Sequence, residues 1–207
     1  MNNVFEWNPG NIIRAAWVVW ILWWLVAAGR VNPMKRREPI HEWVLRWVLM
    51  IAAFELLFQP GSYLGALNRR FVPHTQLVLE AGAAITCIGL AFSIWARQHI
   101  GRYWSGSVSI RADHKLIRTG PYSRIRHPIY TGILVGLAGT LLADGHYAAI
   151  VAFLVVLAGL SWKALREESL LKGEFGAAFE EHRRMTGFFL PHLSRTTSPE
   201  APSTSPS

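Results

Sequence analysis

The chain has 207 residues, of which 51% are hydrophobic, 12% aromatic and only 16% charged. A typical soluble domain carries about 25% charged residues, so this composition argues against a soluble protein. In a membrane protein, the net charge of +8 reflects the retention of Lys and Arg on the cytoplasmic side, and we expect no nucleic-acid partner. A single cysteine, Cys87, excludes an internal disulfide.

Apolar runs recur along the chain at lengths suited to membrane spans. A helix needs about 20 mostly apolar residues to cross the hydrocarbon core of a bilayer. Five runs approach this length, and they occupy residues 12–28, 43–58, 76–96, 129–143 and 147–165. The sequence therefore predicts an all-α membrane protein, a bundle of about five transmembrane helices.

The basic residues predict how these spans are oriented. Seventeen of the 21 Lys and Arg residues follow the first, third or fifth run. They are Arg30, Lys35, Arg36 and Arg37, then Arg97, Arg102, Arg111, Lys115, Arg118, Arg124 and Arg126, then Lys163, Arg166, Lys172, Arg183, Arg184 and Arg195. Because Lys and Arg stay on the cytoplasmic side, we expect the N-terminus outside and the C-terminus in the cytosol, with the bacterial inner membrane as the location.

Two further features concern the extent of the membrane domain. Glu55 lies within the second run, where an ionisable group faces a bundle interior or sits near the helix end and reaches the interface. The end of the chain, 193–207, consists mostly of Ser, Thr, Pro and Ala and cannot form a core. We expect a membrane domain over 1–192 and a disordered tail after it.

The polar segment between the third and fourth runs holds the first group of candidate site residues. Gly120 and Pro121 indicate a turn, and Pro128 suits the first turn of the next helix. Arg126, His127 and Tyr130 should then converge at a helix N-terminus on the membrane surface, where free N–H groups favour anions. The alternative is that this basic loop has no role in a site and only determines the orientation of the protein in the membrane.

A second group follows the fifth run. Lys163 and Glu167 are four residues apart and should share a helix face, as a solvated pair or as part of a site. Farther on, apolar residues recur at intervals of three and four from Leu171 to His182. This spacing predicts an amphipathic helix along the membrane or over the site.

Taken together, these motifs resemble the isoprenylcysteine carboxyl methyltransferase family and its bacterial relatives over about residues 76–192. The motifs that carry the resemblance are His114-Lys115-Leu116-Ile117, Gly120-Pro121-Tyr122, Arg126-His127-Pro128-Ile129-Tyr130-Thr131-Gly132, Glu167-Glu168 with Phe175-Gly176, and Pro191. The resemblance implies a helical membrane bundle whose cytosolic loops and C-terminal amphipathic helix form a cofactor site. It implies S-adenosylmethionine as the cofactor, methyl transfer as the reaction, and no metal.

The resemblance also assigns roles to residues. The cofactor would contact His114, Lys115, Leu116, Ile117, Tyr122, His127, Pro128, Ile129, Tyr130 and Glu167. The groups expected to orient the reactants are Arg126, His127 and Lys163. Lys163 stands where the family has an arginine, and so keeps the charge without the planar two-pronged geometry. Phe179 and His182 stand where the family has tyrosines.

The acceptor stays open among several lipophilic groups. A prenylcysteine-type carboxylate is implied by the resemblance, and a small thiol or a phospholipid amine is an alternative. Such an acceptor would enter sideways from the membrane lipids. A sterol-type reductase using a nicotinamide cofactor shares a similar His-Pro-x-Tyr pattern, and a membrane scaffold is the non-enzymatic alternative. A transporter should carry more polar residues inside its helices. The sequence leaves the oligomeric state open.

Overall fold

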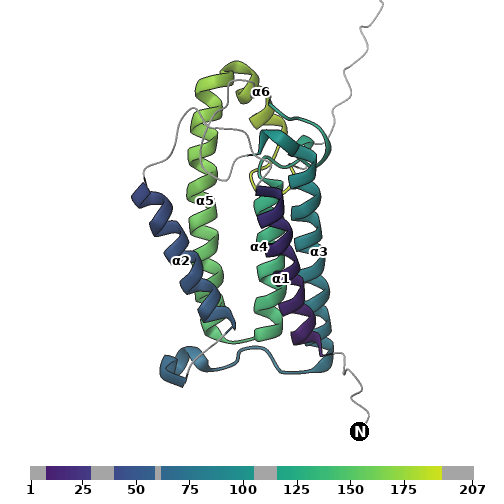
Figure 1. The fold of residues 1–207 in the computed structure, drawn as a ribbon, viewed down its shortest axis with the longest axis vertical. Coiled ribbons are helices and arrows are strands. Elements are labelled where there is room, and N and C mark those ends of the chain that lie inside the picture. The colour runs from purple at the N-terminus through teal and green to yellow at the C-terminus, as the bar shows by residue number, and fades with distance from the viewer. Residues whose placement is uncertain (1–7, 29–39, 59–61, 105–115, 193–207) are drawn as a thin grey trace, which may run out of the picture.

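The computed structural model describes residues 8–28, 40–58, 62–104 and 116–192, and this part of the chain is helical with no strand element. Its α-helices are α1 (Pro9–Ala28), α2 (Ile40–Phe58), α3 (Gln76–Ile100), α4 (Pro128–Asp144), α5 (Tyr147–Phe175) and α6 (Ala177–Met185). Three short 3-10 helices join them, η1 (Ser62–Asn68), η2 (Gly101–Tyr103) and η3 (Gly120–Ser123). The predicted all-α fold is confirmed (Figure 1).

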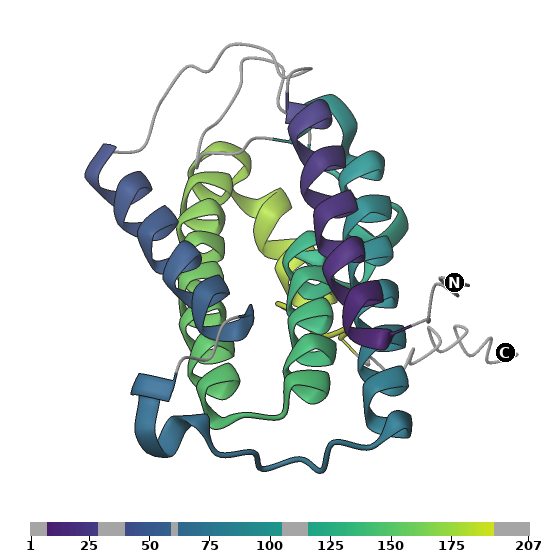
Figure 2. The same ribbon diagram turned by 60° about the horizontal axis from the view of Figure 1, so that its bottom comes forward.

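The first five helices run alternately up and down the bundle, and α6 folds back at the end where α5 finishes (Figures 1 and 2). Each predicted run forms one of these helices. Three of them, within α1, α3 and α5, are long and apolar enough to cross a membrane, at 19, 25 and 29 residues. Shorter apolar segments lie in α2 and α4. The chain is therefore an integral membrane protein.

The outer surface of the bundle is apolar, as a lipid-facing surface must be. Large hydrophobic side chains are exposed along α1, α2 and α5, including Leu22, Leu25, Val48, Ile51 and Leu154. In a soluble protein such a surface would mark an interface or an aggregation hazard. In a bilayer, lipid tails cover it, and only the interior contacts remain to hold the helices together.

The closest helix contact joins α3 to α4 through glycines. A Cβ atom added at Gly89 would collide with the backbone nitrogen of Gly136 and lie 2.7 Å from the carbonyl oxygen of Gly132. One level farther along, a Cβ on Gly82 would lie 2.7 Å from the carbonyl oxygen of Gly139. Small residues at these positions let the two backbones touch, which is a common way of packing helices in lipid.

Side-chain hydrogen bonds fasten α1 to this pair. The indole nitrogen of Trp17 donates to the hydroxyl of Thr140 at 3.0 Å, and that hydroxyl lies 3.2 Å from the hydroxyl of Thr86. One turn along α1, the indole of Trp20 donates to the hydroxyl of Ser93 at 2.6 Å. Because the hydrocarbon core offers no other hydrogen-bond partners, these bonds fix the position of α1 against α3 and α4.

The Trp17→Phe variant is expected to unfold more readily than the wild type in detergent. It keeps most of the buried ring but loses the bond to Thr140, which costs on the order of 0.5–1.5 kcal/mol. Thermal unfolding, monitored by the circular dichroism of the helices, would show this as a lower midpoint. Trp95→Phe is the matched control because Trp95 is 49% exposed, and equal midpoints for the two variants would contradict the expectation.

The helix that contains the fifth apolar run continues beyond it to Phe175, because the polar stretch after Leu165 is also made of good helix formers. One expectation about the helices needs correction. The amphipathic helix predicted from Leu171 to His182 is broken, since Gly176 adopts a positive φ of 48° and separates α5 from α6.

Two positions were expected for Glu55, the interior of the bundle or the end of its helix. Its side chain is exposed on the outside of the bundle, one turn before the end of α2. The structure therefore favours the helix-end alternative over a place in the interior.

Candidate functional site

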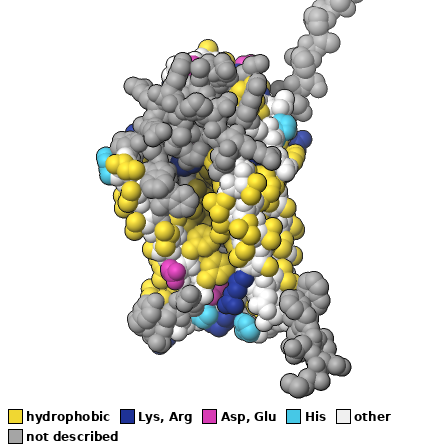
Figure 3. Space-filling view, viewed as in Figure 1, with side chains coloured by type: hydrophobic (Ala, Val, Ile, Leu, Met, Phe, Trp, Pro, Cys, Tyr) yellow, Lys and Arg dark blue, Asp and Glu magenta, His cyan; other side chains and the backbone are white. Residues whose placement is uncertain are grey.

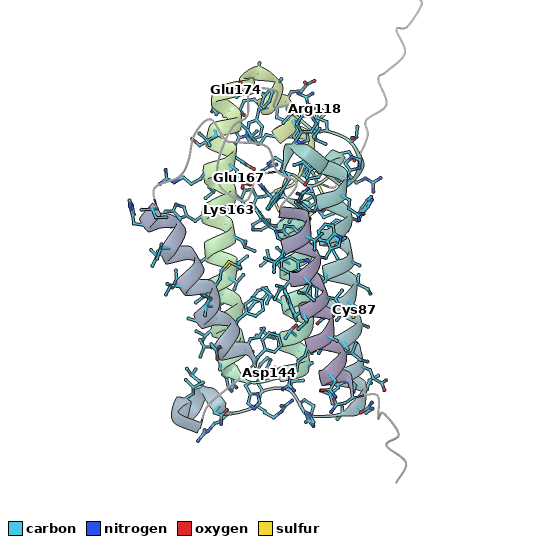
Figure 4. All side chains as sticks on the ribbon, in the orientation of Figure 1. Cys87, Arg118, Asp144, Lys163, Glu167 and Glu174 are labelled. Carbon is cyan, nitrogen blue, oxygen red and sulfur yellow. The ribbon has the colours of Figure 1, made fainter. Side chains whose placement is uncertain are left out.

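Two acidic residues of α5 meet the start of α4 at the end of the bundle where α6 lies. Glu167 and Lys163 are on α5 at this end, and Asp144 marks the opposite end (Figure 4). Arg126 and His127 directly precede α4, and Tyr130 is in its first turn. Pro128 begins α4 because its missing N–H needs no partner there. The sequence elements predicted to converge are thus brought together.

Glu168 is the centre of one half of the site. One of its carboxylate oxygens, Oε1, accepts from Nε of Arg126 at 2.6 Å and lies 3.1 Å from Nε2 of His127. The side chains of Arg126 and Glu168 are each 12% exposed, and His127 is 6% exposed. A buried pair with such bonds fixes the geometry of both partners. Glu168 therefore locks the loop before α4 onto α5.

Glu167 is the centre of the other half, and it is more open. Its Oε1 accepts a hydrogen bond from the Tyr130 hydroxyl at 2.7 Å and lies 3.8 Å from Nζ of Lys163. Its Oε2 is 3.8 Å from Nδ1 of His127. The Glu167 side chain is 24% exposed. Lys163 and Glu167 lie as their four-residue spacing predicts, with the ammonium 5.4 Å from the centre of the Tyr130 ring.

The rings of His127 and Tyr130 lie nearly parallel, with centroids 5.6 Å apart and an interplanar angle of 9°. Phe188 packs edge-on against His127 at 5.0 Å. These contacts leave His127 little freedom to rotate. The site consequently combines an accessible carboxylate and a cation with aromatic walls that are already ordered.

The segment after α6 straps the loop before α4 in place. The amide of Gly187 donates to the Arg124 carbonyl at 3.0 Å, and the amide of Arg126 donates to the Gly187 carbonyl at 2.8 Å. The His127 amide donates to the Phe188 carbonyl at 3.2 Å. The guanidinium of Arg126 also donates to the carbonyl of Thr186. Arg126 is thus held by both α5 and this strap.

The remaining predicted cofactor residues are placed as follows. Leu116 and Ile117 are half-buried, while Pro128 and Ile129 are buried, with Ile129 in the hydrophobic core. His114 and Lys115 lie outside the described residues. Contact with a ligand from this part of the chain would therefore use the backbone of Pro128 and Ile129 more than their side chains.

Tyr122 lies beside the site, on η3. Burial raises the pKa of its hydroxyl, and the nearby Glu167 carboxylate raises it further, with Arg97 acting in the opposite direction. The hydroxyl stays protonated and donates to the Ala96 carbonyl at 3.4 Å. Tyr122 therefore ties η3 to α3 and offers its ring, not a proton, to this region.

Several residues that shape the site were not predicted. Glu168 is one, although its place in the Glu167-Glu168 motif was a usable signal. Arg97 is another: it is 6% exposed, its guanidinium lies 4.3 Å from the Trp104 ring centroid, and it donates to the Gly101 carbonyl at 2.8 Å. The strap residues Phe188 and Phe189 carry no local periodicity that indicates a partner far along the chain.

His182, on α6, should make the strap sensitive to acid. Burial lowers its pKa from the usual 6.5, and Arg118 and Arg126 lower it further. A histidine that stays neutral when folded supports stability above pH 6.5, and that support is lost as pH falls below this value. We expect the unfolding midpoint to drop between pH 7.5 and pH 5.5, and to drop less in His182→Gln. An undiminished drop in His182→Gln, matching that of the exposed His41→Gln control, would contradict this expectation.

A bundle of apolar helices with a cluster of polar side chains at one end defines the general class of the protein as a helical integral membrane protein. Residues 82–172 match the isoprenylcysteine carboxyl methyltransferase family. The matched region contains the residues through which Glu167 and Glu168 contact α4 and the loop before it.

The relatives carry two kinds of name. Protein-S-isoprenylcysteine O-methyltransferase of Schizosaccharomyces pombe is 30% identical over 101 residues, 47% of this chain and 43% of the relative. The nickel-cobalt-cadmium resistance protein NccN of Alcaligenes xylosoxydans xylosoxydans is 34% identical over 115 residues, 54% of this chain and 52% of the relative. The cobalt-zinc-cadmium resistance protein CzcN of Cupriavidus metallidurans is 35% identical over 97 residues, which are 46% of this chain and 44% of the relative.

The chain spans about half the length of the curated relatives it matches. A solved structure of the eukaryotic intramembrane Ras methyltransferase is 22% identical, with a TM-score of 0.47, and the match covers 74% of this chain and 52% of that one.

Proposed function

We propose that this chain is an S-adenosylmethionine-dependent methyltransferase that acts on a lipophilic acceptor. The observation that carries the proposal is the partly exposed carboxylate of Glu167, set between the Tyr130 hydroxyl at 2.7 Å and the Lys163 ammonium at 3.8 Å. The match of residues 82–172 to the isoprenylcysteine carboxyl methyltransferase family supports the same assignment. Because the Glu167 side chain is 24% exposed, a polar ligand can reach its carboxylate while the contact with Lys163 is kept.

The donor set at this position suits S-adenosylmethionine. The cofactor carries an amine, a carboxylate and a sulfonium, and when bound it would supply a methyl group activated by the positive sulfur. Glu167 offers an anion to the amine, and the faces of Tyr130 and Tyr122 offer aromatic surface that attracts cations by roughly 0.5–2 kcal/mol. In this proposal the cofactor is held by His127 to Tyr130 and Glu167, and Leu116 and Ile117 also contact it.

The residues around Glu168 then act by positioning. Arg126 and His127 both bond to one oxygen of Glu168, so they hold α4, α5 and the strap in one arrangement. A carboxylate or thiolate acceptor is already nucleophilic and needs no strong base. Rate enhancement would come from alignment and from the exclusion of water, as the burial of Arg126, His127 and Glu168 favours.

A side entrance fits a lipophilic acceptor. The helices α1 and α2 touch through Trp17 and Phe54, whose ring centroids are 5.2 Å apart, and they diverge toward the site end (Figures 1 and 2). A hollow lined by hydrophobic side chains opens between them on the face shown in Figure 3. In our proposal the apolar part of the acceptor enters here from the membrane, while the cofactor arrives from the aqueous side.

The aqueous side is the cytosol in this proposal. Arg118, Arg124 and Arg166 lie at the site end, with Arg183 and Arg184 on α6. Basic residues of this density stay on the cytoplasmic side of a membrane. The bacterial inner membrane remains the proposed location, with the N-terminus outside.

The charge of Lys163 favours a carboxylate as the acceptor group. Its ammonium is 11% exposed and faces the Tyr130 ring, so it would attract an anionic group and repel the cationic amine of a phospholipid. A prenylcysteine-type carboxylate fits this charge and the hydrophobic entrance together. A neutral thiol satisfies only the second condition.

A transfer assay tests the acceptor. The purified protein receives labelled S-adenosylmethionine and a farnesylated cysteine with a free carboxylate, or its carboxamide, a farnesyl thiol or a phosphatidylethanolamine. We expect label in the carboxylate alone, and at least about tenfold less transfer in Lys163→Gln, as for a lost charge-assisted contact. Lys172→Gln is the control because Lys172 is 65% exposed. Label in the thiol or amine would overturn the carboxylate assignment.

A further inference from the structure

An open cavity lies at the end of the bundle opposite to Glu167. Its volume is about 510 Å³, and it is bordered by the start of α1, the end of α2, the residues around the start of α3 and the end of α4. One part of its lining is apolar and includes Ile13, Leu57, Phe58 and Leu79. The other part is polar and basic, formed by Arg14, Arg70, His74 and Gln76, with Asp144 at the α4 end.

Arg70 is fixed in place before any ligand arrives. The amide of Phe71 donates to the Gly145 carbonyl at 2.8 Å, and the amide of Tyr147 donates to the Arg69 carbonyl at 3.1 Å. These bonds fasten the backbone on both sides of Arg70 to the turn between α4 and α5. Its guanidinium also reaches the carbonyl oxygens of Ala143 at 3.5 Å and Val72 at 3.4 Å.

The charge of the cavity is positive. Arg14, on α1, and Arg70, in the segment before α3, both line this space. The acid that also lines it, Asp144, already accepts from the backbone amide and from Nδ1 of His146, each at 3.1 Å. Figure 3 shows basic and histidine side chains gathered at this end, directly below the hydrophobic hollow.

We propose that this cavity binds the phosphate group of a membrane lipid. Arg14 and Arg70 would hold the phosphate, since guanidinium groups match its geometry and charge. The first part of an acyl chain would lie along Leu57, Phe58 and Leu79. A lipid is favoured over free phosphate because the cavity has an apolar wall and lies at one end of the membrane bundle. Free phosphate would use neither feature. The site is separate from methyl transfer, as the opposite positions of Asp144 and Glu167 in Figure 4 show.

Native mass spectrometry of the full chain in detergent tests the proposal. The probes are a short-chain phosphatidylglycerol, a diacylglycerol with the same chains, and inorganic phosphate. We expect one phosphatidylglycerol to bind per chain, weakened at least about tenfold in the Arg14→Gln/Arg70→Gln double variant. Arg69→Gln is the matched control because Arg69 is exposed beside Arg70 but does not line the cavity. Inorganic phosphate at high concentration should displace the lipid from the wild type.

Other results would overturn the proposal. Equal binding of diacylglycerol would show that the phosphate is not recognised. A protein that binds inorganic phosphate but does not bind phosphatidylglycerol would exclude a lipid ligand. Equal losses in the double variant and in Arg69→Gln would show a diffuse charge effect. Because the phosphate competition uses wild-type protein, it decides the question even if the double variant does not fold. Glu167→Gln should leave lipid binding unchanged, so failure here is distinguishable from failure of the methyltransferase proposal.

Discussion

The Glu167→Gln variant is expected to bind S-adenosylmethionine about 100-fold more weakly than the wild type, since losing one partner of a hydrogen-bonded charge pair that the bound ligand covers costs about 2–5 kcal/mol. Glutamine keeps the size of the side chain and still accepts from the Tyr130 hydroxyl. It removes the negative charge that faces Lys163 at 3.8 Å and that we assign to the cofactor amine. Calorimetric titration of both proteins in detergent measures the difference.

The matched control is Glu174→Gln, on the same helix. Glu174 is exposed and lies about two turns farther along α5 than Glu167, beyond the site (Figure 4). Its variant changes the net charge of the chain by the same amount, and we expect it to bind the cofactor as the wild type does. Equal affinities in the two variants would remove Glu167 from the proposed cofactor site.

The Gly89→Ala variant is expected to show the largest loss of stability among single methyl additions in the bundle. The added Cβ would collide with the backbone of Gly136, where no flexible side chain can move away. Overpacking costs typically about 1–3 kcal/mol, or several degrees in the unfolding midpoint of a chain of this size. Because α4 also carries Tyr130, movement of α4 should reduce cofactor binding as well.

Gly159→Ala is the control for this effect. Gly159 is inside α5, and a Cβ added there meets nothing within 4 Å. Alanine is the better helix former by roughly 1 kcal/mol, so this variant should be as stable as the wild type or more so. A Gly89→Ala protein that unfolds at the wild-type temperature would show that α3 and α4 are not packed through these glycines.

The positions of the five long helices could be predicted because each one is written locally, as an apolar run of suitable length. The residues at which these helices end were harder to predict. The run ending at Leu165 marks the end of the apolar stretch, whereas α5 continues to Phe175 on helix propensity alone. The break at Gly176 depends on a single positive φ, and the three- and four-residue spacing across it remained regular.

The site was predictable where residues are neighbours on one helix, and less so where it joins distant segments. The pair Lys163 and Glu167 follows from its spacing. The strap at Gly187 and Phe188 contacts Arg126 and His127 from about 60 residues away along the chain, and no periodicity encodes such a pairing. The glycine contact between α3 and α4 had a signal, Gly132 and Gly136 four residues apart, that was not used.

The most direct test of the central claim is a calorimetric titration of the wild-type protein with S-adenosylmethionine, beside a titration with a reduced nicotinamide dinucleotide. Our account predicts saturable binding of one S-adenosylmethionine per chain and no binding of the nicotinamide. A folded protein that fails to bind S-adenosylmethionine, or that binds the nicotinamide in its place, would contradict the assignment as a methyltransferase.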